Sequence, residues 1–252
     1  MPKTVQRFEI PGRTIHWFDS IGSTMTVAAE LAREDCPHGT VVVADEQTAG
    51  IGRHGHSWHS PKGAGLYVSI VLRLPKAAPM VMLALGLATR EAIASGLRGA
   101  GLRPVLAGHR PAPLVDLRWP NDVLLRGRKC AGVISQLEGS AVIAGIGINL
   151  SQTAFPEGID ATSLLLAGAT PKREDVLVSL LQAVDRWSSA DATAILSGFE
   201  AASSFARGLR VRVEQGGVEG VTQGLDNSGF LIVLQDNGQN ATILAGGVRP
   251  CS

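Results

Sequence analysis

Apolar and polar positions divide the chain into two regions with different periods. Up to about residue 206, short unbroken apolar runs alternate with longer segments in which apolar residues recur every three or four positions. Such runs are typical of buried strands, and the longer segments of helices that pack on a sheet. Beyond residue 208, short alternating runs are separated by glycine-containing turns, which predicts antiparallel strands joined by hairpins. The pattern predicts an α+β protein with two domains, residues 1–206 and 207–252.

The individual elements follow from these runs. In the first region we expect a short strand that stops at Pro120 and buried strands over residues 13–18, 40–44, 66–72, 130–137 and 141–150. We expect helices over residues 26–33, 79–97 and 171–187, and one that ends near 205. Ser23 or Thr24 is the natural N-cap of the first helix. In the second region we expect a small barrel with strands over residues 209–213, 220–225, 230–234 and 241–244.

One segment of the first region carries no element in this prediction. Residues 99–113 are rich in glycine, proline and alanine, and we expect them to form a mobile surface connection.

Composition narrows the class of protein. The chain has 252 residues, of which 45% are hydrophobic, so a sizeable core is expected. The formal net charge of +1 gives no electrostatic reason to expect nucleic acid or an anionic membrane as a partner. The three cysteines, Cys36, Cys130 and Cys251, are scattered, which argues against a disulfide framework and fits a reducing cytoplasm. The sequence contains no apolar run long enough to predict a signal peptide or a membrane span.

The segment Asp45–Gly65 contains five glycines and lies between two predicted strands. Glycines let a backbone approach a ligand closely, and consecutive N–H groups in such a loop can bind an anion. Arg53 adds a charged fork suited to phosphate. The alternatives are a flexible surface loop and a metal site built on the three histidines of the segment, His54, His56 and His59, although no nearby carboxylate or cysteine completes such a site.

A second informative block covers residues 117–150. Its charged residues gather at strand ends and turns beside two long apolar strands, and they are Arg118, Asp122, Arg126, Arg128 and Lys129. An ordinary antiparallel meander is the structural alternative, but it does not explain why the charges gather there.

Together these segments resemble the biotin protein ligase family. The glycine loop with Gln47 and Trp58 resembles the biotin-binding loop of the family. The family signature Lys-Trp-Pro-Asn-Asp is similar to Trp119-Pro120-Asn121-Asp122, with Arg118 in place of the Lys. Lys129 with Gly132 is similar to its Lys-x-x-Gly motif, and Gly145–Asn149 to its Gly-x-Gly-x-Asn strand. The chain departs from the family pattern at Met25, Ile51 and His56.

The resemblance implies a fold and a reaction. The fold is a mixed β-sheet catalytic domain like that of class II aminoacyl-tRNA synthetases, followed by a small SH3-like barrel. The reaction is ATP-dependent biotinylation of a lysine on a biotin carboxyl carrier protein, through biotinyl-5′-AMP. Mg²⁺ is the expected metal. The longer family members that double as repressors have a DNA-binding domain for which this chain has no room, so we expect no operator binding. Dimers through the central sheet occur in the family, so monomer and homodimer are both alternatives for this protein.

The resemblance also implies roles for individual residues. Arg53 and Lys129 are the implied catalytic residues. The implied biotin-binding residues are Ser23, Thr24, Gln47, Gly50, Arg53, Trp58, Lys129 and Gly132. The implied ATP and adenylate residues are Arg53, His56, Trp58, Asn121, Asp122, Asn149 and Phe155, and a loop anchor is the equal alternative for Phe155. Asp122 is the implied Mg²⁺ ligand or water-holder.

Two other functions stay open. A weakened paralogue that only holds biotin or its adenylate would explain the departures from the family pattern. A lipoate or octanoate ligase would share the catalytic fold, although the Trp119–Asp122 signature favours biotin.

Overall fold

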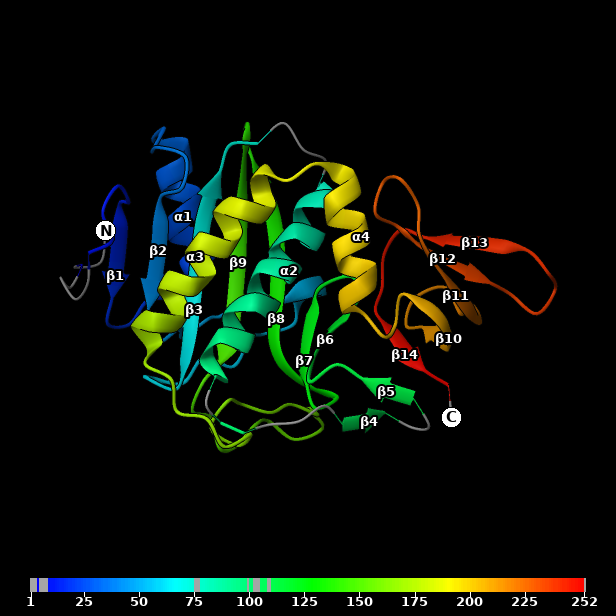
Figure 1. Ribbon diagram of the computed structural model, residues 1–252. Coiled ribbons are helices and arrows are strands. Elements are labelled where there is room, and N and C mark those ends of the chain that lie inside the picture. Colours follow the sequence, from blue (N-terminus) through cyan, green and yellow to red (C-terminus); the bar gives the residue numbers. More distant parts are fainter. Residues whose placement is uncertain are drawn as a thin grey trace.

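The computed structural model describes residues 4, 9–74, 78–98, 100–101, 105–107 and 110–251. A mixed seven-stranded sheet forms its centre, in the order β1-β2-β3-β9-β8-β7-β6 (Figure 1). The strands are β1 (Ile15–Phe18), β2 (Val41–Ala44), β3 (Gly65–Leu72), β6 (Val115–Arg118), β7 (Asp122–Leu125), β8 (Arg128–Glu138) and β9 (Ala141–Asn149). Only β1 and β2 pair in parallel, and the remaining pairs are antiparallel. The predicted buried strands are therefore confirmed.

Helices cover both faces of this sheet. Helices α2 (Ala78–Gly96) and α3 (Arg173–Ser189) lie on one face, where Figure 1 shows them in front of the strands, and α4 (Ala192–Ala202) follows at the β6 side. Helix α1 (Thr24–Arg33) packs on the other face, in a separate core with Phe18, Val42 and Ile143. Ser23 caps α1, because its Oγ accepts a hydrogen bond from the Met25 N–H at 3.3 Å. The four predicted helices are confirmed, with ends that differ by a few residues.

The C-terminal part forms a separate five-stranded antiparallel sheet, in the order β13-β12-β11-β10-β14. Its strands are β10 (Arg207–Val213), β11 (Glu219–Leu225), β12 (Leu231–Leu234), β13 (Asn240–Ile243) and β14 (Val248–Pro250). The four strands predicted here are present, joined at the predicted glycine turns. Trp119 Nε1 donates to the Gly229 carbonyl at 3.1 Å, which joins the β6–β7 turn of the large sheet to a turn of the small one.

The structure corrects the sequence prediction in two places. The expected connection over residues 99–113 contains a two-stranded hairpin, β4 (Val105–Ala107) with β5 (Arg110–Ala112), and the rest of that segment lies partly outside the described residues. The hairpin was not predicted because two strands can pair through their backbones without the alternating apolar residues by which a strand is recognised in a sequence. Strand β14 was missed because only three residues pair, and they pair with the distant strand β10. No helix among the described residues is both long and apolar enough to cross a membrane.

Candidate active site

Strand register brings the two informative blocks to one row across the large sheet. Ala44 pairs with Tyr67, Tyr67 with Gly147, and Gly147 with Gly132. Gly132 pairs in turn with Asp122, which pairs with Arg118. Residues directly opposite on neighbouring strands point to the same face of a sheet. The row therefore faces the side on which α1 packs, and it places Lys129, three residues before Gly132, beside the glycine loop.

A buried polar shell stands at the start of α1. The N–H and the hydroxyl of Thr24 both donate to Gln47 Oε1, at 2.9 and 3.0 Å. Gln47 Nε2 donates to Ser60 Oγ at 2.9 Å, and the Ser69 hydroxyl donates to Thr24 Oγ1 at 2.8 Å. The predicted residues Ser23, Thr24 and Gln47 thus lie together. Ser60 and Ser69 were missed, although a serine inside the apolar run Leu66–Leu72 was a detectable signal.

The Trp58 ring lies on a glycine patch formed by Gly132, Gly145 and Gly147. A Cβ atom at Gly147 would lie 2.4 Å from the indole, and one at Gly132 would lie 3.0 Å from it. Met25 covers the third glycine, since a Cβ at Gly145 would lie 2.6 Å from its sulfur. The Trp58 Nε1 atom is buried and has no hydrogen-bond partner among the described residues. The patch is therefore a flat space that only glycines leave open, and an aromatic ring occupies it.

Gly50 allows the loop to close on itself behind this ring. The Trp58 N–H donates to the Gly50 carbonyl at 2.9 Å, and Ser60 Oγ donates to the Trp58 carbonyl at 3.0 Å. A Cβ at Gly50 would lie 2.4 Å from the Trp58 carbonyl oxygen, so a larger residue would push the strands of the loop apart.

Two cations pair with one carboxylate next to the patch. Asp122 Oδ1 lies 2.6 Å from Lys129 Nζ, and Asp122 Oδ2 lies 2.6 Å from a guanidinium nitrogen of Arg118. Burial raises the pKa of Asp122, but the charges of Lys129 and Arg118 outweigh burial and hold it below its ordinary value. The carboxylate is therefore ionised at neutral pH. Lys129 Nζ also lies 5.4 Å from the centre of the Trp58 ring, within cation–π range.

Arg53 completes the positive cluster. It begins the short 3₁₀ turn η1 (Arg53–Gly55) and donates to the Asn121 side-chain oxygen. Burial lowers the pKa of Arg53, and the nearby carboxylates Asp122 and Glu214 oppose that shift. A guanidinium stays charged in proteins. With Lys129, Arg118 and Asp122, the cluster carries a net charge of +2, which suits an anionic ligand.

A cavity of about 510 Å³ opens beside this cluster. Arg53, Ile51 and Met25 line it from the site, and Leu244 and Phe230 line it from the C-terminal sheet. Ile51, one of the positions where the chain departs from the family pattern, is 44% exposed and faces this cavity.

The end of β9 and the loop after it form the last wall of the site. Asn149 is buried, and its Nδ2 donates to the Thr162 carbonyl at 3.0 Å. The Thr162 N–H donates to the Lys129 carbonyl at 2.9 Å, so the loop is fastened to the β8 start that carries the lysine. Phe155 is half-exposed in this loop, and His56 is exposed in the glycine loop. Their predicted ligand contacts stay predictions.

The alternative metal site of the glycine loop would rest on its histidines. Within the described residues, no group of three histidine, cysteine, aspartate or glutamate side chains is placed to hold a metal. His56 and His59 are exposed, and the side chain of His54 lies outside the described part of the chain. The histidine metal site considered above therefore has no support.

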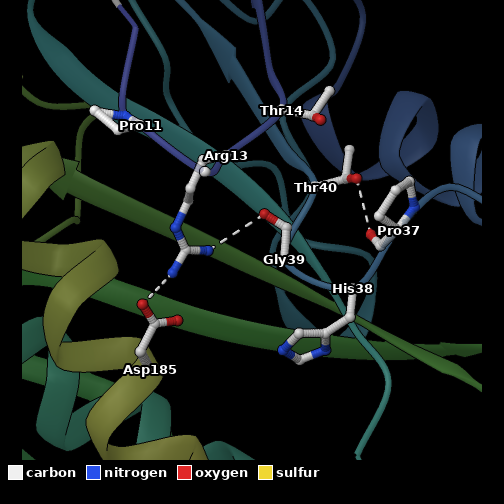
Figure 2. Close-up of a pocket in the computed structure, with 9 residues that line it drawn as sticks. Pro11, Arg13, Thr14, Pro37, His38, Gly39, Thr40 and Asp185 are labelled. Atoms are coloured by element: carbon white, nitrogen blue, oxygen red, sulfur yellow. Dashed lines mark hydrogen bonds and ion pairs between the residues drawn. The ribbon is translucent and has the colours of Figure 1, made fainter.

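A second cavity, of about 320 Å³, lies at the opposite end of β1 and β2. Figure 2 shows Arg13 between the two elements that it joins, since it pairs with Asp185 of α3 and donates to the Gly39 carbonyl at 3.3 Å. The arginine charge is thus neutralised inside the molecule. We assign this region to the packing of α3 against β1 and β2.

Comparison with known proteins decides the family. The model of the biotin/lipoate A/B protein ligase family matches residues 17–152, and the biotin protein ligase C-terminal domain matches residues 208–248. The chain belongs to the biotin/lipoate A/B protein ligase family. The biotin–[acetyl-CoA-carboxylase] ligase of Mycobacterium tuberculosis is 34% identical over 222 residues, which cover 83% of this chain and 78% of that protein.

Two solved biotin protein ligases are similar in structure. The ligase from Aquifex aeolicus in complex with biotin and ATP has a TM-score of 0.78 and 28% identity, covering 94% of this chain and 99% of that one. The ligase from Leishmania major in complex with biotinyl-5-AMP has a TM-score of 0.67 and 25% identity, covering 94% of this chain and 100% of that one. The biotin/lipoate ligase match of residues 17–152 contains the polar shell, the glycine patch and Lys129.

Proposed function

We propose that the protein is a biotin protein ligase that activates biotin with ATP and transfers it, through biotinyl-5′-AMP, to a lysine of a biotin carboxyl carrier protein. The observation that carries the proposal is the cluster of Arg53, Lys129 and Arg118 around Asp122, which adjoins the glycine patch and the polar shell. Family membership and the relatives described above agree with this reaction.

The polar shell and the glycine patch suit the two parts of biotin. The ureido ring carries one carbonyl and two N–H groups, which match the hydroxyls and amide of Ser23, Thr24 and Gln47. The remaining thioether ring and aliphatic chain would lie against Trp58 and Met25, the side chains that cover the glycine patch. The buried Trp58 N–H, which has no partner in the described part of the chain, would gain one from a ligand oxygen.

The positive cluster serves the first step. A carboxylate oxygen of biotin attacks the α-phosphorus of ATP, the bond to the β-phosphate oxygen breaks, and pyrophosphate leaves with the electron pair. Two anions must meet, so cations fixed before the reaction lower the barrier most. Lys129 and Arg53 supply them, and Asp122 holds the ammonium of Lys129 in place.

The second step requires exclusion of water. The adenylate is a mixed anhydride, so the acceptor amine must reach its carbonyl before water does. The acceptor lysine nitrogen attacks that carbonyl, AMP leaves, and an amide forms. The glycine loop and the loop that follows β9, fastened to Lys129 through Thr162, are the segments that would cover the intermediate.

The expected role of Asp122 as a Mg²⁺ ligand stays a prediction. Each carboxylate oxygen lies 2.6 Å from a cation, and Oδ1 has no hydrogen-bond partner among the described residues. We propose that Asp122 orients Lys129, and that a Mg²⁺ ion that neutralises phosphate charge arrives with ATP.

Three further assignments, of the domain boundary, the compartment and the acceptor protein, complete the proposal. We place the domain boundary near residues 206 and 207, where α4 has ended and β10 begins. The free state of all three cysteines supports a reducing compartment, the cytoplasm. The name of the Mycobacterium tuberculosis relative supports the acetyl-CoA carboxylase carrier as acceptor, and a homodimer remains a hypothesis.

The test is exchange of labelled pyrophosphate into ATP, measured with and without biotin, lipoate and octanoate. We expect exchange that depends on biotin alone. Binding of biotin without any exchange would contradict the enzyme and favour a ligand-holding paralogue. Exchange with lipoate or octanoate would assign the protein to the other branch of its family.

A further inference from the structure

Gln152, which follows β9 by three residues, is a buried polar side chain that no role above explains. It is 3% exposed. Its Nε2 donates to Asn149 Oδ1 at 3.2 Å and to the Tyr67 hydroxyl at 3.4 Å, and its backbone carbonyl accepts from Ser163 Oγ at 2.7 Å. A buried carboxamide is costly unless its groups are hydrogen-bonded, so these contacts call for a reason.

The orientation of Asn149 follows from a backbone carbonyl. The Thr162 carbonyl can only accept, so it requires the Asn149 amide nitrogen, which lies at 3.0 Å. The Asn149 oxygen must then face Gln152, and an oxygen there requires a donor. Gln152 Nε2 is that donor.

The other contact of Gln152 leads to the same assignment. The Pro61 carbonyl can only accept, so the Tyr67 hydroxyl donates to it, at 3.0 Å. Burial raises the pKa of Tyr67 well above its ordinary value, so the phenol keeps its proton. The Tyr67 oxygen therefore accepts from Gln152. Two chains of hydrogen bonds, each ending on a carbonyl, meet at the two N–H groups of one side chain.

Among the described residues, the Gln152 carboxamide makes its contacts through its nitrogen and not through its oxygen. Oε1 is buried and has no hydrogen-bond partner within the described residues. The side chain thus makes both contacts through its donor group, while its acceptor costs free energy. This is the arrangement expected where two donors are needed at one point, which a hydroxyl or a carboxylate cannot supply.

We propose that Gln152 is a positioning residue that sets the orientation of the Asn149 carboxamide and, through it, the preference for adenine. The inference rests on the proposed function and on the contact of Asn149 with the adenylate that the family resemblance implies. With one donor and one acceptor already engaged, Asn149 keeps one N–H and one lone pair for a base. A carboxamide in a fixed orientation matches adenine, which offers an amine and a ring nitrogen, and mismatches guanine, which carries a carbonyl in place of that amine.

The test uses three variants of the full chain. Gln152→Glu keeps the shape of the side chain but replaces the donor by an acceptor, and Gln152→Met removes both contacts. Ser163→Ala is the matched control, because it removes a hydrogen bond from the backbone of the same residue and leaves the Asn149 amide untouched. Thermal unfolding establishes how far each variant is destabilised.

Calorimetry in the presence of biotin gives the affinities for ATP and GTP. We expect Gln152→Glu to weaken ATP binding on the order of tenfold, as for one well-placed hydrogen bond, and to narrow the ATP-to-GTP preference. Gln152→Met should have a smaller effect of the same sign, and Ser163→Ala should lower Tm with the preference unchanged. Biotin affinity should stay within about twofold in all three.

The outcomes separate the two proposals. An unchanged ATP-to-GTP preference in both Gln152 variants would reduce the residue to a structural role, even if the wild-type protein exchanges pyrophosphate. A lost preference in a protein without biotin-dependent exchange would keep the positioning role and overturn the ligase reaction. Loss of preference in Ser163→Ala as well would show that any loosening of the loop has this effect, and would overturn the role of Gln152.

Discussion

Replacement of Lys129 by alanine should separate catalysis from stability. The ammonium lies 2.6 Å from Asp122, but the lysine side chain is 28% exposed. After the change, Asp122 still pairs with Arg118 at 2.6 Å, so no buried carboxylate is left unpaired. The losses are one half-exposed ion pair and one cation–π contact, together about 1–2 kcal/mol. For a protein of this size that corresponds to a Tm shift of roughly 2–8 °C.

The expected effect on the reaction is much larger. Removing one fixed cation from a water-excluded site should slow adenylation on the order of a hundredfold or more, equivalent to about 2.7 kcal/mol in the barrier. The assay is single-turnover formation of biotinyl-AMP at saturating biotin and ATP, with Tm measured in parallel.

Arg128→Ala is the matched control. The neighbouring Arg128 carries the same charge but is 51% exposed and pairs with Asp160 at 2.8 Å, on the loop rather than in the cluster. We expect it to keep the wild-type rate. If Lys129→Ala forms the adenylate as fast as Arg128→Ala, Lys129 has no catalytic role. Equal loss in both variants would show that net charge, and not the position of Lys129, determines the rate.

Three further predictions follow from the same geometry. Because the folded-state pKa of Asp122 is lowered, its stabilisation is fully present above the ordinary carboxyl pKa of about 3.9 and is lost as the pH falls through the lower folded value. Asp122→Asn should therefore lower the free energy of unfolding in urea by about 2–3 kcal/mol at pH 7, and the difference from wild type should narrow below pH 4. A difference that does not change with pH would refute the ion pairs. Gly147→Ala should weaken biotin binding in calorimetry, because its Cβ would lie 2.4 Å from the Trp58 ring and would displace it, and unchanged affinity would place the ligand elsewhere. Ile51→Arg should tighten biotinyl-AMP binding by about 1–3 kcal/mol and biotin binding by less, since position 51 lines the cavity, and no gain for the adenylate would contradict that placement.

The sequence alone determined the elements and the chemical groups of the site. Apolar runs such as Leu66–Leu72 predicted strands because backbone pairing buries them on both faces, and the 3.6-residue period of residues 171–187 predicted α3. The cap at Ser23 and the turns of the C-terminal sheet depend on neighbouring residues only, and both were predicted correctly. The loop and turn motifs likewise identified Arg53, Lys129 and Asp122 as charged residues of one site.

Only the tertiary structure decided how these groups act. The row from Arg118 through Asp122 and Gly132 to Gly147 depends on the register of four strands, which local sequence does not encode. That register turns Asp122, expected to bind a metal, toward two cations.

The same reason explains the residues that sequence analysis missed. Gln152 and Tyr67 look like ordinary loop and strand positions, since their importance comes from partners up to 85 positions away in the chain. A buried polar group must find a partner across the fold, so its role depends on which distant segments the packing brings together. The sequence alone thus determined which groups are present, whereas folding decided which of them meet and in which orientation.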